Sequence, residues 1–275
     1  MKASKKMIGI GAALFTMLTS PSAFGDENTE AAKKLANPIA AMISVPFQYN
    51  YDSDIGEYDK GSRSTLNIQP VIPFDLNEDW NLISRTILPV IWQDDIAYDP
   101  ISGTGTGSQS GFGSIVQSLF FSPKAPTADG WIWGAGPVFL LPTATNDLLG
   151  GDQWGAGPTA VGLKQDGHLT YGALANHIWS FAEDTNAKIS RTFLQPFFAY
   201  ITDEAVTYSI NTETTYDWES EDWSVPINAQ VSKVLKIGSQ LVSLQLGARY
   251  WVVSDAPSTP EGWGIRATVT LIYPK

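Results

Sequence analysis

The segment 262–273 alternates apolar and polar side chains with one exception, Ile272. Successive side chains of a β-strand point to opposite faces, so this pattern predicts a strand with one apolar and one polar face. Trp263 and Tyr273 bound the apolar face. Such a strand is typical of an outer-membrane barrel, in which the apolar face contacts lipid and the polar face lines the lumen.

Related patterns recur along the chain and predict a single antiparallel up-and-down barrel of twelve strands. Short connections with turn-forming residues alternate with longer polar ones, as periplasmic turns and external loops do in such barrels. A soluble β-sandwich with buried tryptophans is the alternative fold. The predicted strands are 39–50, 62–73, 80–92, 111–122, 131–142, 154–165, 169–180, 190–201, 206–215, 223–235, 242–253 and 262–273.

The N-terminus predicts export from the cytoplasm. Lysines precede an apolar run that ends in Ala23-Phe24-Gly25, so residues 1–25 are predicted to be a secretory signal peptide. A buried N-terminal helix is the alternative. Residues 26–37 are then a periplasmic lead-in, and 38–275 are the barrel. No later stretch is apolar for about 18 residues, so no transmembrane helix is predicted.

The composition agrees with an outer-membrane location. Only 16% of the residues are charged, against roughly 25% in a typical soluble domain. There is no cysteine, which excludes disulfides and thiolate sites. The net charge of −11 argues against nucleic acid as a partner. The expected partners are outer-membrane lipid and lipopolysaccharide, the barrel assembly machinery and small-molecule solutes. The sequence does not indicate an oligomeric state.

Aromatic residues gather at the ends of the predicted strands. Tryptophan and tyrosine prefer membrane interfaces because one part of the ring is apolar and another forms hydrogen bonds. Trp133, Trp154, Trp179 and Trp251 also lie near strand ends. The main predicted interface aromatics are Trp80, Trp92, Trp131, Trp223, Trp263 and Tyr273.

All the arginines fall on the polar parity of a predicted strand or at its edge. An arginine that faces lipid costs about 2–4 kcal/mol at the midplane, so the lumen is the expected side. These side chains could form a charge-selective constriction. They could equally form a packed polar network that plugs the lumen and stiffens the barrel. The predicted lumen residues are Arg63, Arg85, Arg191, Arg249, Arg266, Glu213, Asn211, Gln230 and Gln245.

Four further features add detail to the predicted barrel. Prolines inside predicted strands each remove a hydrogen-bond donor, so bulges or bends are expected. The fourth and fifth strands are apolar on both parities, and the sixth and seventh are rich in Gly and Ala, which indicates an apolar lumen wall; the alternative is a lumen filled by its own side chains or by the loop 93–110. The loop 93–110 is rich in Gly, Thr and Ser and is the candidate to fold over the mouth. Most carboxylates, Asp52 and Asp217 among them, are assigned to external loops as a solvated or lipopolysaccharide-bridging rim.

The residues do not favour catalysis. His177 and Ser180 are three positions apart, so a strand places them on opposite faces, whereas a Ser–His couple needs contact at about 3 Å. The His-x-Ser-Asn-Gly run of twelve-stranded outer-membrane phospholipases is absent. No phosphate loop, dinucleotide fingerprint or calcium-binding spacing occurs. The protein is therefore predicted to have no catalytic residues, no cofactor and no metal site.

Several stretches resemble an outer-membrane barrel family labelled "MetA-pathway of phenol degradation", some members of which carry the name neuromedin U. The resemblance implies an outer-membrane channel for aromatic or other hydrophobic compounds. It assigns no transport residues. The matching stretches are 37–48, 67–74, 155–160, 176–181 and 194–196.

The expected function is passive passage of small solutes across the outer membrane. A closed structural or surface-interaction barrel without transport activity is the alternative. Both functions use the same fold, so the contents of the lumen decide between them.

Overall fold

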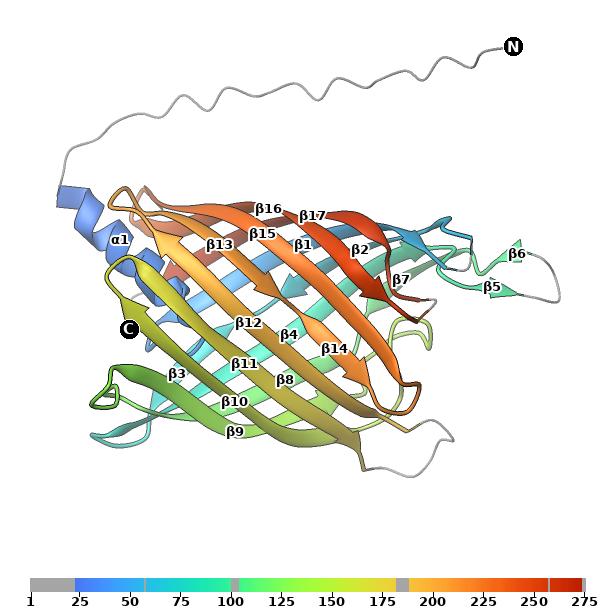
Figure 1. Cartoon of the computed structure of the whole chain (residues 1–275), viewed down its shortest axis with the longest axis horizontal. Helices are drawn as coiled ribbons and strands as arrows, with labels where there is room; N and C mark the ends of the chain where they lie inside the picture. Colours follow the sequence, from blue (N-terminus) through green and yellow to red (C-terminus); the bar gives the residue numbers. More distant parts are fainter. Residues whose placement is uncertain (1–22, 57, 100–103, 182–187, 257, 274–275) are drawn as a thin grey trace, which may run out of the picture.

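The chain forms one closed β-barrel with a short helix at one end (Figure 1). This computed structural model describes residues 23–56, 58–99, 104–181, 188–256 and 258–273. The elements are α1 Ala23–Leu35, β1 Ile43–Ile55, β2 Gly61–Ile68, β3 Val71–Asp75, β4 Trp80–Asp94, β5 Tyr98–Asp99, β6 Thr104–Gly105, β7 Ser108–Phe112, β8 Ile115–Pro123, β9 Trp131–Leu141, β10 Gly155–Asp166, β11 Leu169–Ser180, β12 Ser190–Ile201, β13 Val206–Thr212, β14 Thr214–Asp217, β15 Asp222–Ile237, β16 Gln240–Ser254 and β17 Gly262–Tyr273.

The barrel wall has twelve positions, as predicted. Every neighbouring pair is antiparallel, and the first and last strands close the wall by pairing Ile43 with Tyr273 and Asn50 with Arg266. Three positions are each built from two successive strands: β2 with β3, β7 with β8, and β13 with β14. Closure leaves no free strand edge, which is how a sheet satisfies its backbone groups in lipid.

The predicted strands coincide closely with the observed ones. The bounds of β12 and β17 are as predicted, and β1 differs most because it begins and ends later, at Ile43–Ile55. The short connections lie at one end of the barrel, here called the turn end, and the longer ones lie at the other, the loop end.

The loop 93–110 is longer than the others, but its described part does not lie across the mouth. It forms a small hairpin of β5 and β6, and Figure 1 shows this hairpin projecting beyond the loop end. Residues 100–103 lie outside the described residues. The predicted signal peptide does as well, apart from its last three residues, which begin α1.

Strand β17 shows why the alternating pattern predicted two faces. Ile265 is 60% exposed on the outside of the barrel, whereas its neighbour Arg266 is only 2% exposed on the inside. The outer face is therefore apolar, and the inner face carries the polar groups. Ile272, the exception to the alternation, is buried on the inside, where it meets the helix.

The prolines bend the wall as expected. Pro70 separates β2 from β3, and the β15–β16 register shifts at Pro226. Pro137 of β9 lies directly opposite Pro158 of β10, and each is preceded by a glycine. A side chain on Gly136 would collide with the backbone oxygen of Leu119, so glycine permits this close approach.

Helix α1 lies across the turn end of the barrel (Figure 1). It has glutamates near its start and Lys33 and Lys34 in its last turn, which suits the helix dipole. Thr29 donates a hydrogen bond to the backbone oxygen of Asp203, and Lys236 pairs with Glu27 at 2.9 Å. Within the described residues, no helix is long and apolar enough to cross a membrane.

Candidate functional site

The predicted Arg249, Arg266 and Glu213 meet inside the barrel. Arg266 donates from both terminal nitrogens to the two oxygens of Glu213, each at 2.7 Å. Arg249 donates to Glu213 Oε2 at 2.8 Å and to Asp52 Oδ2 at 3.0 Å. Glu213 lies between β13 and β14, while the arginines lie on β16 and β17, so the contacts bridge several strands. This group is called the ion cluster below.

Asparagines complete the ion cluster. Asn50 accepts from Arg266 Nε at 2.7 Å, and Asn228 accepts from Arg249 Nε at 3.1 Å. Asn228 in turn donates to the predicted Asn211 at 2.8 Å. These contacts satisfy charged groups that would otherwise be costly to bury. The cluster therefore matches the packed-network interpretation on one side of the lumen.

Two residues of the ion cluster were assigned elsewhere from the sequence. Asp52 lies within β1 rather than in a loop, because β1 continues to Ile55. Trp251 points inward instead of joining the membrane interface, and its Nε1 donates to Asp52 Oδ1 at 3.0 Å. The Arg249 guanidinium stands 4.9 Å from the centre of the Trp251 ring. Trp251 shares the strand parity of the predicted lumen residue Arg249, two positions before it. Asp52 shares the parity of Asn50, which was not among the predicted lumen residues.

Within the described part of the chain, the other three arginines make no hydrogen bond to the ion cluster, although Arg63 lies directly opposite Asp52 on β2. Arg191 pairs at the loop end with Asp217, which belongs to β14 rather than to a loop, with Nε and Oδ2 2.6 Å apart. Arg63 donates to Gln93 Oε1 at 2.9 Å. Arg85, midway along β4, donates to Gln69 Oε1 at 3.3 Å. Among the described residues, Arg63 and Arg85 form no ion pair.

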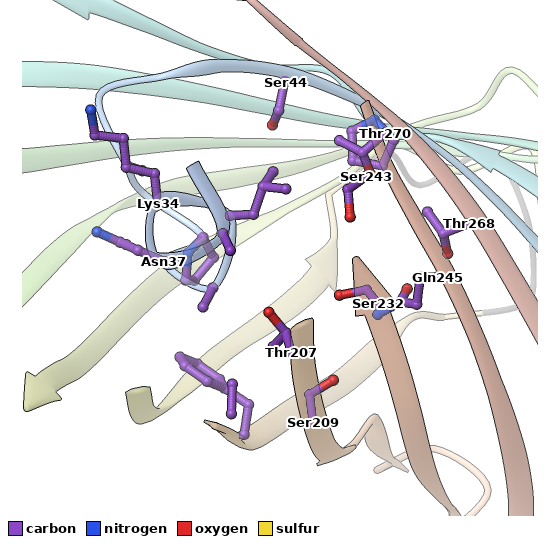
Figure 2. A pocket seen from close by; sticks show the side chains of 18 of the residues that line it. Lys34, Asn37, Ser44, Thr207, Ser209, Ser232, Ser243, Gln245, Thr268 and Thr270 are labelled. Atoms are coloured by element: carbon purple, nitrogen blue, oxygen red, sulfur yellow. The ribbon is translucent and has the colours of Figure 1, made fainter. Parts of the chain in front are cut away.

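Two cavities follow one another along the lumen. The outer cavity, of about 540 Å³, is bordered by Arg85, Arg191, Arg266 and Glu213. The plug cavity, of about 270 Å³, lies between α1 and the strands. Figure 2 shows Lys34 and Asn37 on one side of the plug cavity and hydroxyl side chains of the strands on the other. Both volumes together give the lumen room for small solutes.

The two cavities meet at a ring of residues that border both, here called the waist. It is made largely of amide side chains and contains the predicted Gln245 and Asn211; the predicted Gln230 borders only the outer cavity. The waist residues are Gln48, Gln69, Arg85, Gln195, Ser209, Asn211 and Gln245.

One side of the lumen carries several apolar side chains, beside Arg85, Ser118, Asn176 and Arg191 of the same strands. Ile87, Val116, Leu140, Ile178 and Phe193 border the outer cavity. They come from β4, β8, β9, β11 and β12, which together with β10 form one side of the barrel. The ion cluster and most of the waist amides lie on the other side, so the lumen is two-sided.

Residues 23–42 lie at the turn end and pack against the inside of the barrel (Figure 1); this segment is called the plug below. Ala31 and Ala32 of α1 pack with Ala199 of β12, Val234 of β15 and Ile272 of β17. Ile39, only 4% exposed, packs in a second cluster with Ile83, Phe120, Leu163 and other residues of the apolar side. The chain therefore spans the lumen between its two sides. Two residues in the sequence could have indicated the plug, because Ile272 and Val234 are apolar side chains on strand faces that are otherwise polar.

The predicted interface aromatics lie on the outside of the barrel. Trp92, Trp223 and Trp263 are exposed at the loop end, and Trp131 and Tyr273 are exposed at the turn end. The sixth, Trp80, is half-buried, and its ring makes an edge contact with Trp133 at 5.9 Å. The two sets lie at opposite ends of an apolar outer face, as membrane interfaces require.

His177 also faces outward, among aromatic rings at the loop end. Its Nδ1 lies 2.7 Å from Thr192 Oγ1, and its Nε2 lies 3.5 Å from Ser190 Oγ. Trp179 and Trp218 flank its ring. In the part of the chain that the structure describes, these hydrogen-bond partners include no carboxylate.

Comparison with known proteins decides the fold class. No protein-family model and no curated protein sequence matches the chain. The structure is similar to the COG4313 outer membrane channel from Pseudomonas putida F1, with a TM-score of 0.64, 14% identity, and coverage of 85% of this chain and 96% of that one. The fold is that of an outer-membrane barrel.

Two further solved structures agree with this fold. The NanC porin gives a TM-score of 0.50 at 8% identity and covers 85% of this chain and 99% of its own. The β domain of the Bordetella autotransporter BrkA gives 0.50 at 12% identity and covers 84% and 99%. At these identities the likeness extends to the fold alone.

Proposed function

We propose that the protein is an outer-membrane channel for passive passage of small solutes, including aromatic or hydrophobic compounds. The observation that carries this proposal is the lumen itself, in which two cavities meet at a waist and one side carries several apolar side chains. A barrel kept only as a scaffold has no need for such space. The channel and porin among the similar structures, and the resemblance to the phenol-degradation family, support the same function.

A second function has its own support. The plug and the ion cluster both fill the lumen, which favours a closed structural or surface-interaction barrel. In that case the acidic loops are the functional surface and contact lipopolysaccharide, with divalent ions bridging the carboxylates to its phosphates. Under either function, the protein is exported through the periplasm, inserted by the barrel assembly machinery and surrounded by outer-membrane lipid.

Single-channel recording separates the two functions. The purified protein is refolded in detergent, checked for heat-resistant mobility on gels and inserted into planar bilayers. A channel gives discrete conductance steps, and proteoliposomes that contain it take up small aromatic solutes faster than empty ones. Folded protein that gives neither steps nor uptake would exclude transport.

A further inference from the structure

Arg85 is the least satisfied arginine of the lumen. Its single hydrogen bond, to Gln69 Oε1, is 3.3 Å long, and a guanidinium has five donors. By contrast, Arg249 and Arg266 each make three contacts shorter than this. Within the described residues, Arg85 therefore has donors left over. They lie at the waist, because Arg85 borders both cavities.

The nearby carboxylate does not supply the missing partner. Glu213 borders the same cavity, but its two oxygens accept three hydrogen bonds from Arg249 and Arg266. The charged residues that border the outer cavity are three arginines and this one glutamate. Arg191 is paired with Asp217 and Arg266 with Glu213, so among the described residues Arg85 is the arginine of this cavity without an ion pair, and its positive charge attracts anions.

The surroundings of Arg85 are polar on one side and apolar on the other. Gln69 and the other waist amides offer further hydrogen-bond groups beside the guanidinium. On the same strand, Ile87 borders the outer cavity, and Val116 lies directly opposite it on β8. Phe193 borders the cavity from β12. A solute bound to Arg85 can thus place a ring or short chain against these apolar side chains.

We infer that the outer cavity holds a binding site for small amphipathic organic anions, with aromatic carboxylates as the best-matched class. The carboxylate binds Arg85, whose fork of donors matches its geometry, and the ring packs against Ile87, Val116 and Phe193. The cavity volume of about 540 Å³ lies in the range of small-molecule sites. This inference rests on the proposed function and names the solute class of the same lumen.

The test measures binding rather than conduction. The protein in lipid nanodiscs is titrated calorimetrically with 1-naphthoate and with the neutral 1-naphthalenemethanol, and the heats from empty nanodiscs are subtracted. Arg85→Gln should raise the dissociation constant of 1-naphthoate about tenfold or more, which is the loss expected for one charge-assisted hydrogen bond. The same substitution should change the dissociation constant of the alcohol less than twofold. Arg85→Lys should retain part of the affinity, since it keeps the charge without the fork.

The matched control variant removes one positive charge from the outer face of the barrel instead of from the lumen. Lys164 lies opposite the outward-facing Trp131, so Lys164→Gln should leave 1-naphthoate binding unchanged. Three outcomes would overturn the site. The first is an equal loss of 1-naphthoate affinity in Arg85→Gln and Lys164→Gln, and the second is an equal effect of Arg85→Gln on the affinities for the acid and the alcohol. The third is no binding of 1-naphthoate by the folded protein. Arg85-dependent binding without single-channel conductance would instead overturn transport and leave the site standing.

Discussion

At the scale of single residues, Glu213 holds the ion cluster together. It is the one acidic side chain that contacts both Arg249 and Arg266 in the described structure, and it lies in the gap between β13 and β14. Removing one partner of a buried ion pair leaves the other charge uncompensated, which costs more than the pair contributes. Glu213 should therefore tolerate substitution poorly.

Glu213→Gln should lower the free energy of unfolding by about 3 kcal/mol, because two inward arginines lose their shared carboxylate. The measurement is urea unfolding in detergent micelles, followed by tryptophan fluorescence. Glu219→Gln, at an exposed position of the loop end, is the control and should change stability by less than about 0.5 kcal/mol. Equal stability of the two variants would show that the cluster does not hold the wall together.

At the scale of elements, the plug is the part that can open or close the lumen. It is held by apolar contacts at Ile39 and at the alanines of α1, and by few hydrogen bonds. Segments with such sparse contacts open at a lower free-energy cost than the strands around them. The plug is therefore the expected site of any change between a closed and a conducting lumen.

A disulfide between α1 and the β12–β13 turn tests this role. Thr29 contacts the backbone of Asp203, and the chain has no cysteine of its own, so Thr29→Cys with Asp203→Cys introduces one defined bridge. The oxidised double variant should conduct at least several-fold less than the reduced form. Each single-cysteine variant should be insensitive to reductant. Equal conductance of the locked and reduced forms would place the solute path elsewhere.

At the scale of the whole molecule, the charge of the lumen differs in sign from that of the protein. The chain carries −11 overall, whereas the outer cavity is bordered by three arginines and one glutamate. Selectivity depends on the charges that line the path rather than on the net charge. The acidic loops and the cationic lumen are thus separate electrostatic regions.

The channel should consequently prefer anions. In a potassium chloride gradient, the reversal potential should indicate chloride as the more permeant ion, and Arg85→Glu should move it toward potassium. Lys164→Gln, on the outer face, should leave the reversal potential where it is. A cation preference in the unaltered protein would mean that the acidic loops control permeation.

The sequence predicted the wall of this barrel more fully than its contents. Alternation specifies which face of a strand meets lipid, so Arg266 and Trp263 were assigned to the correct sides. Contacts inside the lumen join residues far apart in the chain, such as Asp52 and Arg249, and periodicity does not encode such pairs. The division between ion cluster and open cavity therefore required the structure.

The docking surface of the plug is assembled from distant parts of the chain. Ala31 and Ala32 rest against Ala199, Val234 and Ile272, and Ile272 belongs to the last strand to be made. That surface is complete once the contiguous strands β12, β13, β15, β16 and β17 have paired with one another. The helix can consequently dock only after the C-terminal strands of the barrel have assembled, and this docking does not itself require the seam between β1 and β17 to be closed.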